Sequence, residues 1–150
     1  MRIALYQPEI PQNTGTLLRL GACLNVGIDI IEPCSFVFSD QRLQRSGMDY
    51  IQECNYHRYP SWSDFYHNQQ TRLILLTPAA RIPYYDFNFQ SDDTLLLGRE
   101  SDGVPQEVAT LCSYHLLIPM IPKRRSINIA LAASMVLGEA LRQTKGFPHA

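Results

Sequence analysis

Two loop segments in the last third of the chain carry residue types that could hold a small polar ligand. The first, 98–105 (GRESDGVP), follows the apolar run 95–97, and the second, 118–128 (IPMIPKRRSIN), precedes a long apolar segment. Glycine and proline fix the backbone of such loops, whose free N–H and C=O groups can then contact a ligand at the ends of strands. The short separation of the two loops predicts a single pocket built from both.

Each notable residue of these loops has a functional and a structural interpretation. Gly98 ends an apolar strand, where a glycine lets a ligand or another backbone approach closely, but an ordinary turn would also use it. Glu100 could act as a general base or orient a ligand, and it could equally cap the following helix. Flanking prolines hold Ile118 and Met120 extended, which suits an adenine-like ring as well as a stiff connection.

Other polar residues stand on expected helices. Ser126 is expected to cap the last helix, with Asn128 in its first turn, and either could contact a ligand. Asn13 is expected to cap the first helix, on which Arg19 interrupts an apolar stretch. The ordinary interpretation of Arg19 is a surface arginine. The four histidines share no pattern with a serine or cysteine, so a hydrolytic triad has no support.

Strand and helix patterns alternate along the chain. Strands are expected at 2–6, 29–32, 57–59, 72–76, 94–97 and 114–118. Helices are expected at about 13–25, 39–47, 61–66, 105–111 and 126–143. The segment 78–93 is expected to be a loop. This alternation predicts one α/β domain over 1–150, with a three-layer, mostly parallel sheet.

The last expected helix is apolar around nearly its whole circumference, as Ile127, Leu131, Met135 and Leu141 illustrate. Such a helix must be covered on most sides. One side can face the sheet and the other a second subunit, which predicts a homodimer, since two-fold dimers are the commonest oligomers. The alternative is a helix sunk entirely in the core.

Composition and charge limit the functional classes to which the protein can belong. The net charge of −1 argues against a strongly basic face, although Arg42 with Arg45, and 123–125, form small basic clusters. The four cysteines form no C-x-x-C pair and have no histidine at finger spacing, so no metal site is expected. Free thiols without an export signal predict a cytoplasmic protein. No apolar run reaches about 18 residues, so no membrane span is expected.

Five separate motifs, in order along the chain, resemble those of one family. They are PEIPQNTG at 8–15 with Arg19, IEP at 31–33, RL at 42–43 with GMDY at 47–50, GRESDGVP at 98–105, and IPM at 118–120 with RSIN at 125–128. The family is the SPOUT RNA methyltransferases, in their TrmL (YibK-like) branch. The resemblance covers essentially the whole chain.

The resemblance implies ribose 2′-O-methylation with S-adenosylmethionine. The implied substrate is the wobble nucleotide, a cytidine or modified uridine, in the anticodon loop of leucine tRNAs. The resemblance also implies a homodimer and a deep trefoil knot at the C-terminal end, which general rules of chain topology would not predict. The implied cofactor contacts are Leu76, Thr77, Gly98, Glu100, Gly103, Ile118, Met120 and Ser126 with Asn128.

The implied catalytic residues are Arg19, Asn13, Glu100 and Asn128. An arginine stays protonated in proteins, so Arg19 is expected to stabilise the developing alkoxide or clamp a phosphate. Glu100 or a water would accept the proton. The residues expected to bind RNA are Arg19, Arg42, Arg45, Lys123, Arg124 and Arg125.

The chain departs from the family pattern at two positions. Arg99 stands where many relatives carry proline, which is expected to place a flexible charge beside the pocket. Ala130 stands where many carry serine, which removes a hydroxyl that could order the site. Both departures leave room for a different substrate preference.

Two alternatives to wobble methylation remain, and the sequence argues against a third. The same fold could methylate ribosomal RNA or another tRNA position. A knotted homologue could bind RNA without turnover, although Arg19 and Asn128 are retained. Electron transfer by a flavodoxin-like protein would need a Ser/Thr-rich phosphate loop, which 8–15 does not resemble.

Overall fold

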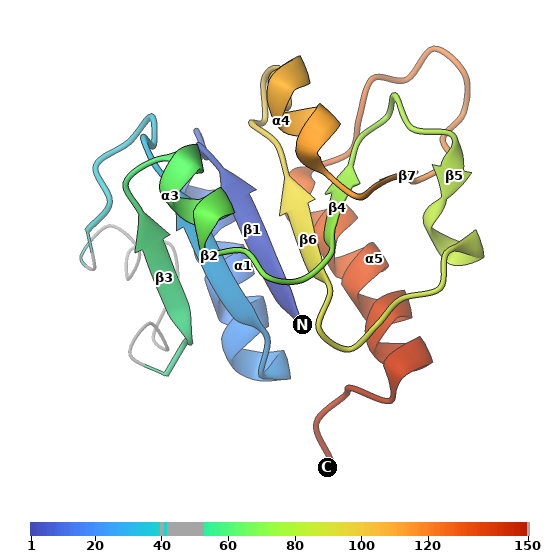
Figure 1. Cartoon of the computed structure of the whole chain (residues 1–150), viewed down its shortest axis with the longest axis horizontal. Helices are drawn as coiled ribbons and strands as arrows, with labels where there is room; N and C mark the ends of the chain where they lie inside the picture. Colours follow the sequence, from blue (N-terminus) through green and yellow to red (C-terminus); the bar gives the residue numbers. More distant parts are fainter. Residues whose placement is uncertain (40, 42–52, 150) are drawn as a thin grey trace.

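A parallel sheet forms the centre of the protein and has helices on both faces (Figure 1). The computed structural model describes residues 1–39, 41 and 53–149. The strands of this part are β1 (Arg2–Tyr6), β2 (Gly27–Ile31), β3 (Tyr56–Tyr59), β4 (Leu73–Leu76), β5 (Ile82–Pro83), β6 (Thr94–Leu97) and β7 (Tyr114–Leu117). Its helices are α1 (Pro11–Leu24), α3 (Trp62–His67), α4 (Gln106–Leu111) and α5 (Ile129–Thr144), with a 3-10 turn at Tyr84–Asp86. The seven strands lie in the order β3-β2-β1-β6-β4-β7-β5.

Two hydrophobic cores lie on opposite faces of the sheet, because side chains alternate along each strand. On β1, Ile3 and Leu5 belong to the core that also contains residues of α1 and α5. Ala4 and Tyr6 belong to the core with residues of α3 and α4. Burial on both faces explains why the central strands read as continuous apolar runs. The predicted three-layer α/β architecture is confirmed.

The segment 78–93 is not the plain loop that the sequence predicts. Within it, β5 pairs with the end of β7 through Ile82 and Leu116, and the 3-10 turn follows directly. A strand of two residues has no alternation that a sequence pattern could reveal. The helix expected at 39–47 lies outside the described residues, apart from 39 and 41.

Two helix starts differ from the expected ones. α1 begins at Pro11 with Ile10 at the N-cap and no side-chain cap there, so Asn13 lies inside the helix. Proline at the first position presets the helical backbone and has no N–H to satisfy. α5 is capped by Asn128, whose Oδ1 accepts hydrogen bonds from the N–H groups of Ala130 (2.8 Å) and Leu131 (3.3 Å). The expected cap, Ser126, lies before the helix.

The apolar circumference of α5 is only partly covered within one protomer. Val136 and Leu137 are fully buried, whereas Leu131 is 61% exposed and Met135 45% exposed. In the part of the chain that the structure describes, no helix is long and apolar enough to cross a membrane. In the same part, no group of three or more His, Cys, Asp or Glu residues could hold a metal ion.

Two ion pairs connect segments near the amino ends of the strands. Arg2 binds Asp29 through two nitrogens, at 2.7 and 2.8 Å. Arg72 binds Asp93 in the same way, with both distances 2.8 Å, and both aspartates are buried. These bidentate contacts satisfy the buried carboxylates in the geometry that favours arginine.

Candidate active site

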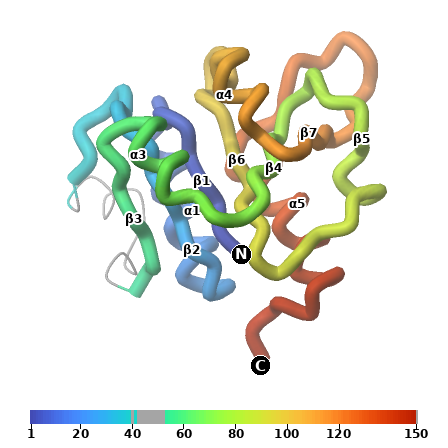
Figure 2. Tube along the Cα trace, in the orientation of Figure 1, coloured from blue at the N-terminus to red at the C-terminus, as the bar shows by residue number. Residues whose placement is uncertain are grey.

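A cleft of about 1040 Å³ opens at the carboxyl ends of β4, β6 and β7. Because these strands are parallel neighbours, their following loops meet at one edge of the sheet. The walls are the segments 75–79, 97–104 and 125–129, with Ile118 and Met120 between them. Figure 2 shows these segments converging beside the start of α5. The volume suits a ligand of cofactor size.

The cleft brings together every residue to which the resemblance assigns a cofactor contact. These are Leu76, Thr77, Gly98, Glu100, Gly103, Ile118, Met120 and Ser126, together with Asn128. Asn13 and Arg125 line the same cleft. The single pocket that the sequence predicts from two loops is confirmed, and the loop after β4 is its third wall.

The loop after β6 forms a tight turn in which residues 99 and 103 pair through their backbones. Arg99 and Gly103 exchange backbone hydrogen bonds of 2.9 and 3.1 Å. A Cβ at Gly98 would lie 2.6 Å from the backbone of Gly103, so only glycine fits there. Gly103 itself has φ of 69°, a left-handed conformation that side chains disfavour. The close approach expected at Gly98 is therefore made by the chain's own backbone.

Glu100 binds the backbone just ahead of α1 and does not cap the helix that follows it. Its carboxylate accepts hydrogen bonds from the backbone N–H groups of Glu9 (2.8 Å) and Ile10 (3.3 Å), at the start of α1. The Nδ2 of Asn13 lies 3.5 Å from the same carboxylate. Of the two roles that the sequence leaves open for Glu100, capping of the following helix, α4, is wrong, because that helix begins after Pro105 with no side-chain cap.

Asn13 and Asn128 form a direct hydrogen bond at the mouth of the cleft. The Nδ2 of Asn128 donates to the Oδ1 of Asn13 at 3.0 Å. Since Asn13 also reaches Glu100, the three side chains form a chain of contacts across the β6 loop, α1 and α5. Three of the four expected catalytic residues therefore lie together.

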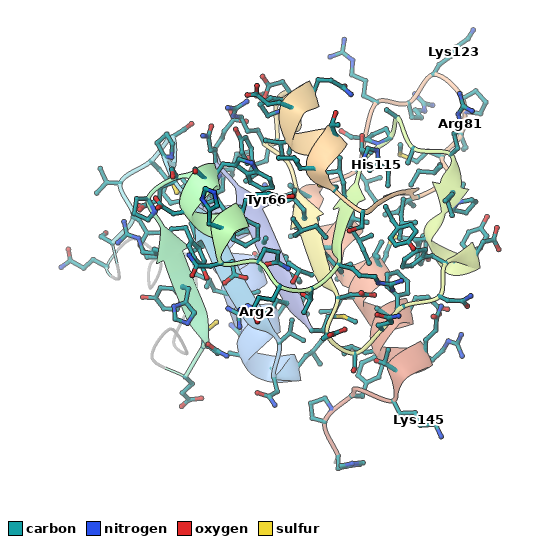
Figure 3. The ribbon with its side chains drawn as sticks, in the orientation of Figure 1. Arg2, Tyr66, Arg81, His115, Lys123 and Lys145 are labelled. Atoms are coloured by element: carbon teal, nitrogen blue, oxygen red, sulfur yellow. The ribbon has the colours of Figure 1, made fainter. Side chains whose placement is uncertain are left out.

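The fourth expected catalytic residue, Arg19, does not line the cleft of its own protomer. It is exposed on α1, about two turns beyond Asn13. Of the expected RNA-binding residues, Arg42 and Arg45 lie outside the described residues. Lys123, Arg124 and Arg125 are exposed in the loop before α5, and Figure 3 shows Lys123 at the outer tip of that loop.

Arg99 is held in place, which corrects the expectation of a flexible charge. Its Nε donates to the Oε1 of Gln7 at 3.1 Å, and its Nη1 lies 3.4 Å from Asp102. The guanidinium also lies over the ring of Tyr6, 5.1 Å from the centroid. With 27% of its side chain exposed, Arg99 is part of the wall of the cleft.

Sequence reasoning missed His115, which lies on β7 and lines the cleft (Figure 3). Its Nε2 is 2.7 Å from the carbonyl oxygen of Ala109 on α4. No motif contains His115. Its place one residue before the buried Leu116 is the only sequence feature that would have indicated a position on the wall of the cleft.

The thiols of Cys34 and Cys112 offer no nucleophile for the cleft. Burial, the largest cause, raises the pKa of Cys112 to about 11. Burial first and the Glu32 carboxylate second raise the pKa of Cys34 to about 11. Both thiols are protonated at neutral pH and therefore unreactive.

The fold and the cleft define the class of α/β proteins whose ligand site lies at the carboxyl edge of a parallel sheet. Within this class, the family model described as SpoU rRNA Methylase family matches residues 1–138, and the chain belongs to this family. The resemblance drawn from the five motifs is thereby confirmed.

Similar proteins have names that describe RNA methylation. A tRNA (cytidine(34)-2'-O)-methyltransferase of Beijerinckia indica is 51% identical over 144 residues, covering 94% of this chain and 90% of the relative. A solved structure described as "Structural insights into the 2-OH methylation of C/U34 on tRNA" has a TM-score of 0.89 and 35% identity, covering 95% of this chain and 94% of its own. The methyltransferase AviRb of Streptomyces viridochromogenes, in complex with AdoMet, has a TM-score of 0.82 and 25% identity, covering 95% of this chain and 60% of its own.

Proposed function

We propose that this protein methylates the ribose 2′-hydroxyl of the wobble nucleotide of tRNA, a cytidine or modified uridine, with S-adenosylmethionine as donor. The observation that carries the proposal is that all residues implied to contact the cofactor line one cleft, beside the paired Asn13 and Asn128. The names of the Beijerinckia relative and of the C/U34 structure support the reaction and the position. Leucine tRNAs are the proposed substrates.

The cleft has features that fit an adenosine-containing cofactor. Leu76, Ile118 and Met120 supply apolar surface, and the Gly98–Gly103 turn exposes backbone close to the cavity. AdoMet bound to the structural relative AviRb supports the same use of the cleft here. When bound, S-adenosylmethionine supplies a methyl group on a sulfonium, which needs alignment more than covalent help.

Residues of this protein would then orient the ribose and stabilise the charge that develops when the 2′-hydroxyl loses its proton. The hydrogen bond between Asn13 and Asn128 fixes their side-chain amides at the cleft, where these amides can orient the ribose. Arg19 stabilises the developing negative charge on the 2′-oxygen or clamps the adjacent phosphate. Both oxygens of Glu100 already accept hydrogen bonds, so of the two proton acceptors we favour a water.

A homodimer would bring Arg19 to the reaction. The exposed Leu131 and Met135 give α5 an apolar surface that a second copy can cover. Arg19 does not line the cleft of its own protomer, so we propose that it completes the cleft of the partner.

We also propose the trefoil knot implied by the resemblance, in the chain from β6 to α5. Tracing that segment in an experimental structure would test it.

Transfer of methyl groups to defined RNAs tests the proposed function directly. We expect the purified protein to label the wobble position of leucine tRNAs when it is given radioactive S-adenosylmethionine. We also expect that 2′-O-methyl group to disappear from the tRNA of cells lacking the gene. Labelling of ribosomal RNA alone, or of another tRNA position alone, would show that the substrate is wrong. Donor binding without labelling of any RNA would favour a non-catalytic RNA-binding protein.

Gly98→Ala should weaken donor binding strongly. The added methyl would lie 2.6 Å from the Gly103 backbone, so the loop after β6 must move out of its place in the wall. We expect the Kd for S-adenosylhomocysteine to rise at least about 30-fold, which corresponds to about 2 kcal/mol. Isothermal titration calorimetry measures this, with Thr110→Ala on the exposed side of α4 as a control that leaves the Kd unchanged. An unchanged Kd in a folded Gly98→Ala protein would contradict the placement of the cofactor.

Binding of tRNA should depend steeply on salt, because the near-neutral chain must gather its cations on one face. Neutralising about four phosphates predicts a roughly 50-fold loss of affinity between 50 and 200 mM salt. Filter binding of a leucine tRNA at several salt concentrations gives the slope. Replacing Arg124 by glutamine should reduce the slope of log affinity against log salt concentration by about one. A change of less than about threefold over this range would argue against a phosphate-binding face.

A further inference from the structure

Two carboxylates point in opposite directions between the segments 7–10 and 98–103. The Glu100 carboxylate accepts hydrogen bonds from the backbone N–H groups of Glu9 (2.8 Å) and Ile10 (3.3 Å). In return, the Glu9 carboxylate accepts from the backbone N–H of Ser101 (2.9 Å) and from its hydroxyl (2.8 Å). Each segment thus supplies one carboxylate and receives the other. We name these contacts the carboxylate exchange.

The carboxylate exchange joins the loop after β6 to the start of α1, the helix that carries Arg19. Glu100 and Ser101 belong to that loop, Glu9 and Ile10 immediately precede α1, and both the loop and the first turn of α1 contribute residues to the cleft. Hydrogen bonds to a charged acceptor are about twice as strong as neutral ones, so the two segments should move together. The bond from Arg99 to Gln7 adds a third link between the same segments.

We propose that the carboxylate exchange transmits occupation of the cleft to the start of α1, which makes Glu100 a positioning residue for Asn13 and Arg19. A ligand that fixes the loop 98–103 also fixes Glu9, and α1 then holds its two polar residues in a single orientation. The proton of the 2′-hydroxyl passes to water. This proposal rests on the proposed function, because it takes S-adenosylmethionine as the ligand of the cleft.

Hydrogen exchange tests the transmission without any need for catalysis. In the native protein, S-adenosylhomocysteine should slow exchange of the amides at 98–103 and also at 9–16. In Glu100→Gln, which loses the charge and one acceptor oxygen, protection should remain at 98–103 and fall at least threefold at 9–16. Glu107→Gln, an exposed carboxylate on α4, should behave like the native protein. Full protection of 9–16 in Glu100→Gln would overturn the proposal.

Kinetics separate a positioning residue from a proton acceptor. We expect Glu100→Gln to lower kcat by about 10- to 30-fold and to retain the acid limb of the pH profile of kcat. Glu9→Gln should lower kcat by a similar factor. The double variant should have a kcat only slightly below that of either single variant, because both substitutions disrupt the same set of contacts. Loss of the acid limb with a fall in kcat beyond 1000-fold would identify Glu100 as the base and overturn the proposal. Absence of S-adenosylhomocysteine binding to the native protein would instead contradict the proposed function.

Discussion

Replacing Arg19 by alanine should lower kcat for tRNA methylation by about 100- to 1000-fold, the range found when a charge-stabilising group is removed from a transition state. Arg19 is exposed on α1 and does not line the cleft of its own protomer. In the cleft of the partner its proposed role is toward the 2′-oxygen or phosphate of the RNA and not toward the cofactor, so the Kd for S-adenosylhomocysteine should change less than threefold. Single-turnover methylation and calorimetry measure the two quantities separately.

The control for Arg19→Ala is a cation at the other end of the molecule. Lys145 follows α5 at its carboxyl end, whereas the cleft lies at the amino end of that helix, about 24 Å away. Lys145→Asn removes one positive charge and suits the left-handed backbone there, so we expect methylation to stay near the native rate. Equal losses in both variants would mean that net charge, and not the position of Arg19, sets the rate. A large loss of cofactor binding in a folded Arg19→Ala protein would also contradict the placement.

Removing the carboxylate of Asp93 should cost about 3–5 kcal/mol of unfolding free energy, the usual result when one partner of a buried ion pair is lost. Asp93 is fully buried, binds Arg72 through both oxygens, and accepts the backbone N–H of Gln90 at 2.7 Å. Asp93→Ala leaves the Arg72 charge half-buried without its partner. Urea denaturation followed by circular dichroism gives the free energy.

A surface ion pair provides the comparison for Asp93→Ala. Glu32 pairs with Arg58, whose side chain is 43% exposed, so Glu32→Ala should cost only about 0–1 kcal/mol. Asp93→Asn keeps the size of the side chain and one acceptor, and it should lose less stability than Asp93→Ala. If Asp93→Ala loses less than about 1 kcal/mol, the ion pair does not stabilise the amino edge of the sheet.

The layered architecture could be predicted from local patterns. Continuous apolar runs such as 94–97 mark strands that are buried on both faces, and the helical segments between them allow parallel pairing. Ser61 opens the helix expected at 61–66, and its Oγ caps α3 by accepting a hydrogen bond from the backbone N–H of Asp64. The two glycine- and proline-punctuated loops indicated the cleft, because the ends of parallel strands meet at one edge.

Contacts between distant segments could not be predicted in the same way. Glu100 finds its partners 90 and 91 residues away, and Arg99 finds Gln7 92 residues away. These contacts exist because β1 and β6 are neighbours in the sheet, which no local pattern states. The pairing of β5 with β7 and the bond between Asn13 and Asn128 arise from tertiary placement in the same way.

By itself, the sequence determined the α/β class, the family and the two loops that form much of the cleft, since periodicity and short motifs are properties of neighbouring residues. The tertiary structure alone decided that Glu100 binds the backbone ahead of α1, that Arg99 is fixed, and that Arg19 lies outside the cleft of its own protomer. The physical reason is that a polar side chain forms its strongest available hydrogen bonds with whatever the strand order brings near it. Strand order depends on the packing of the whole chain.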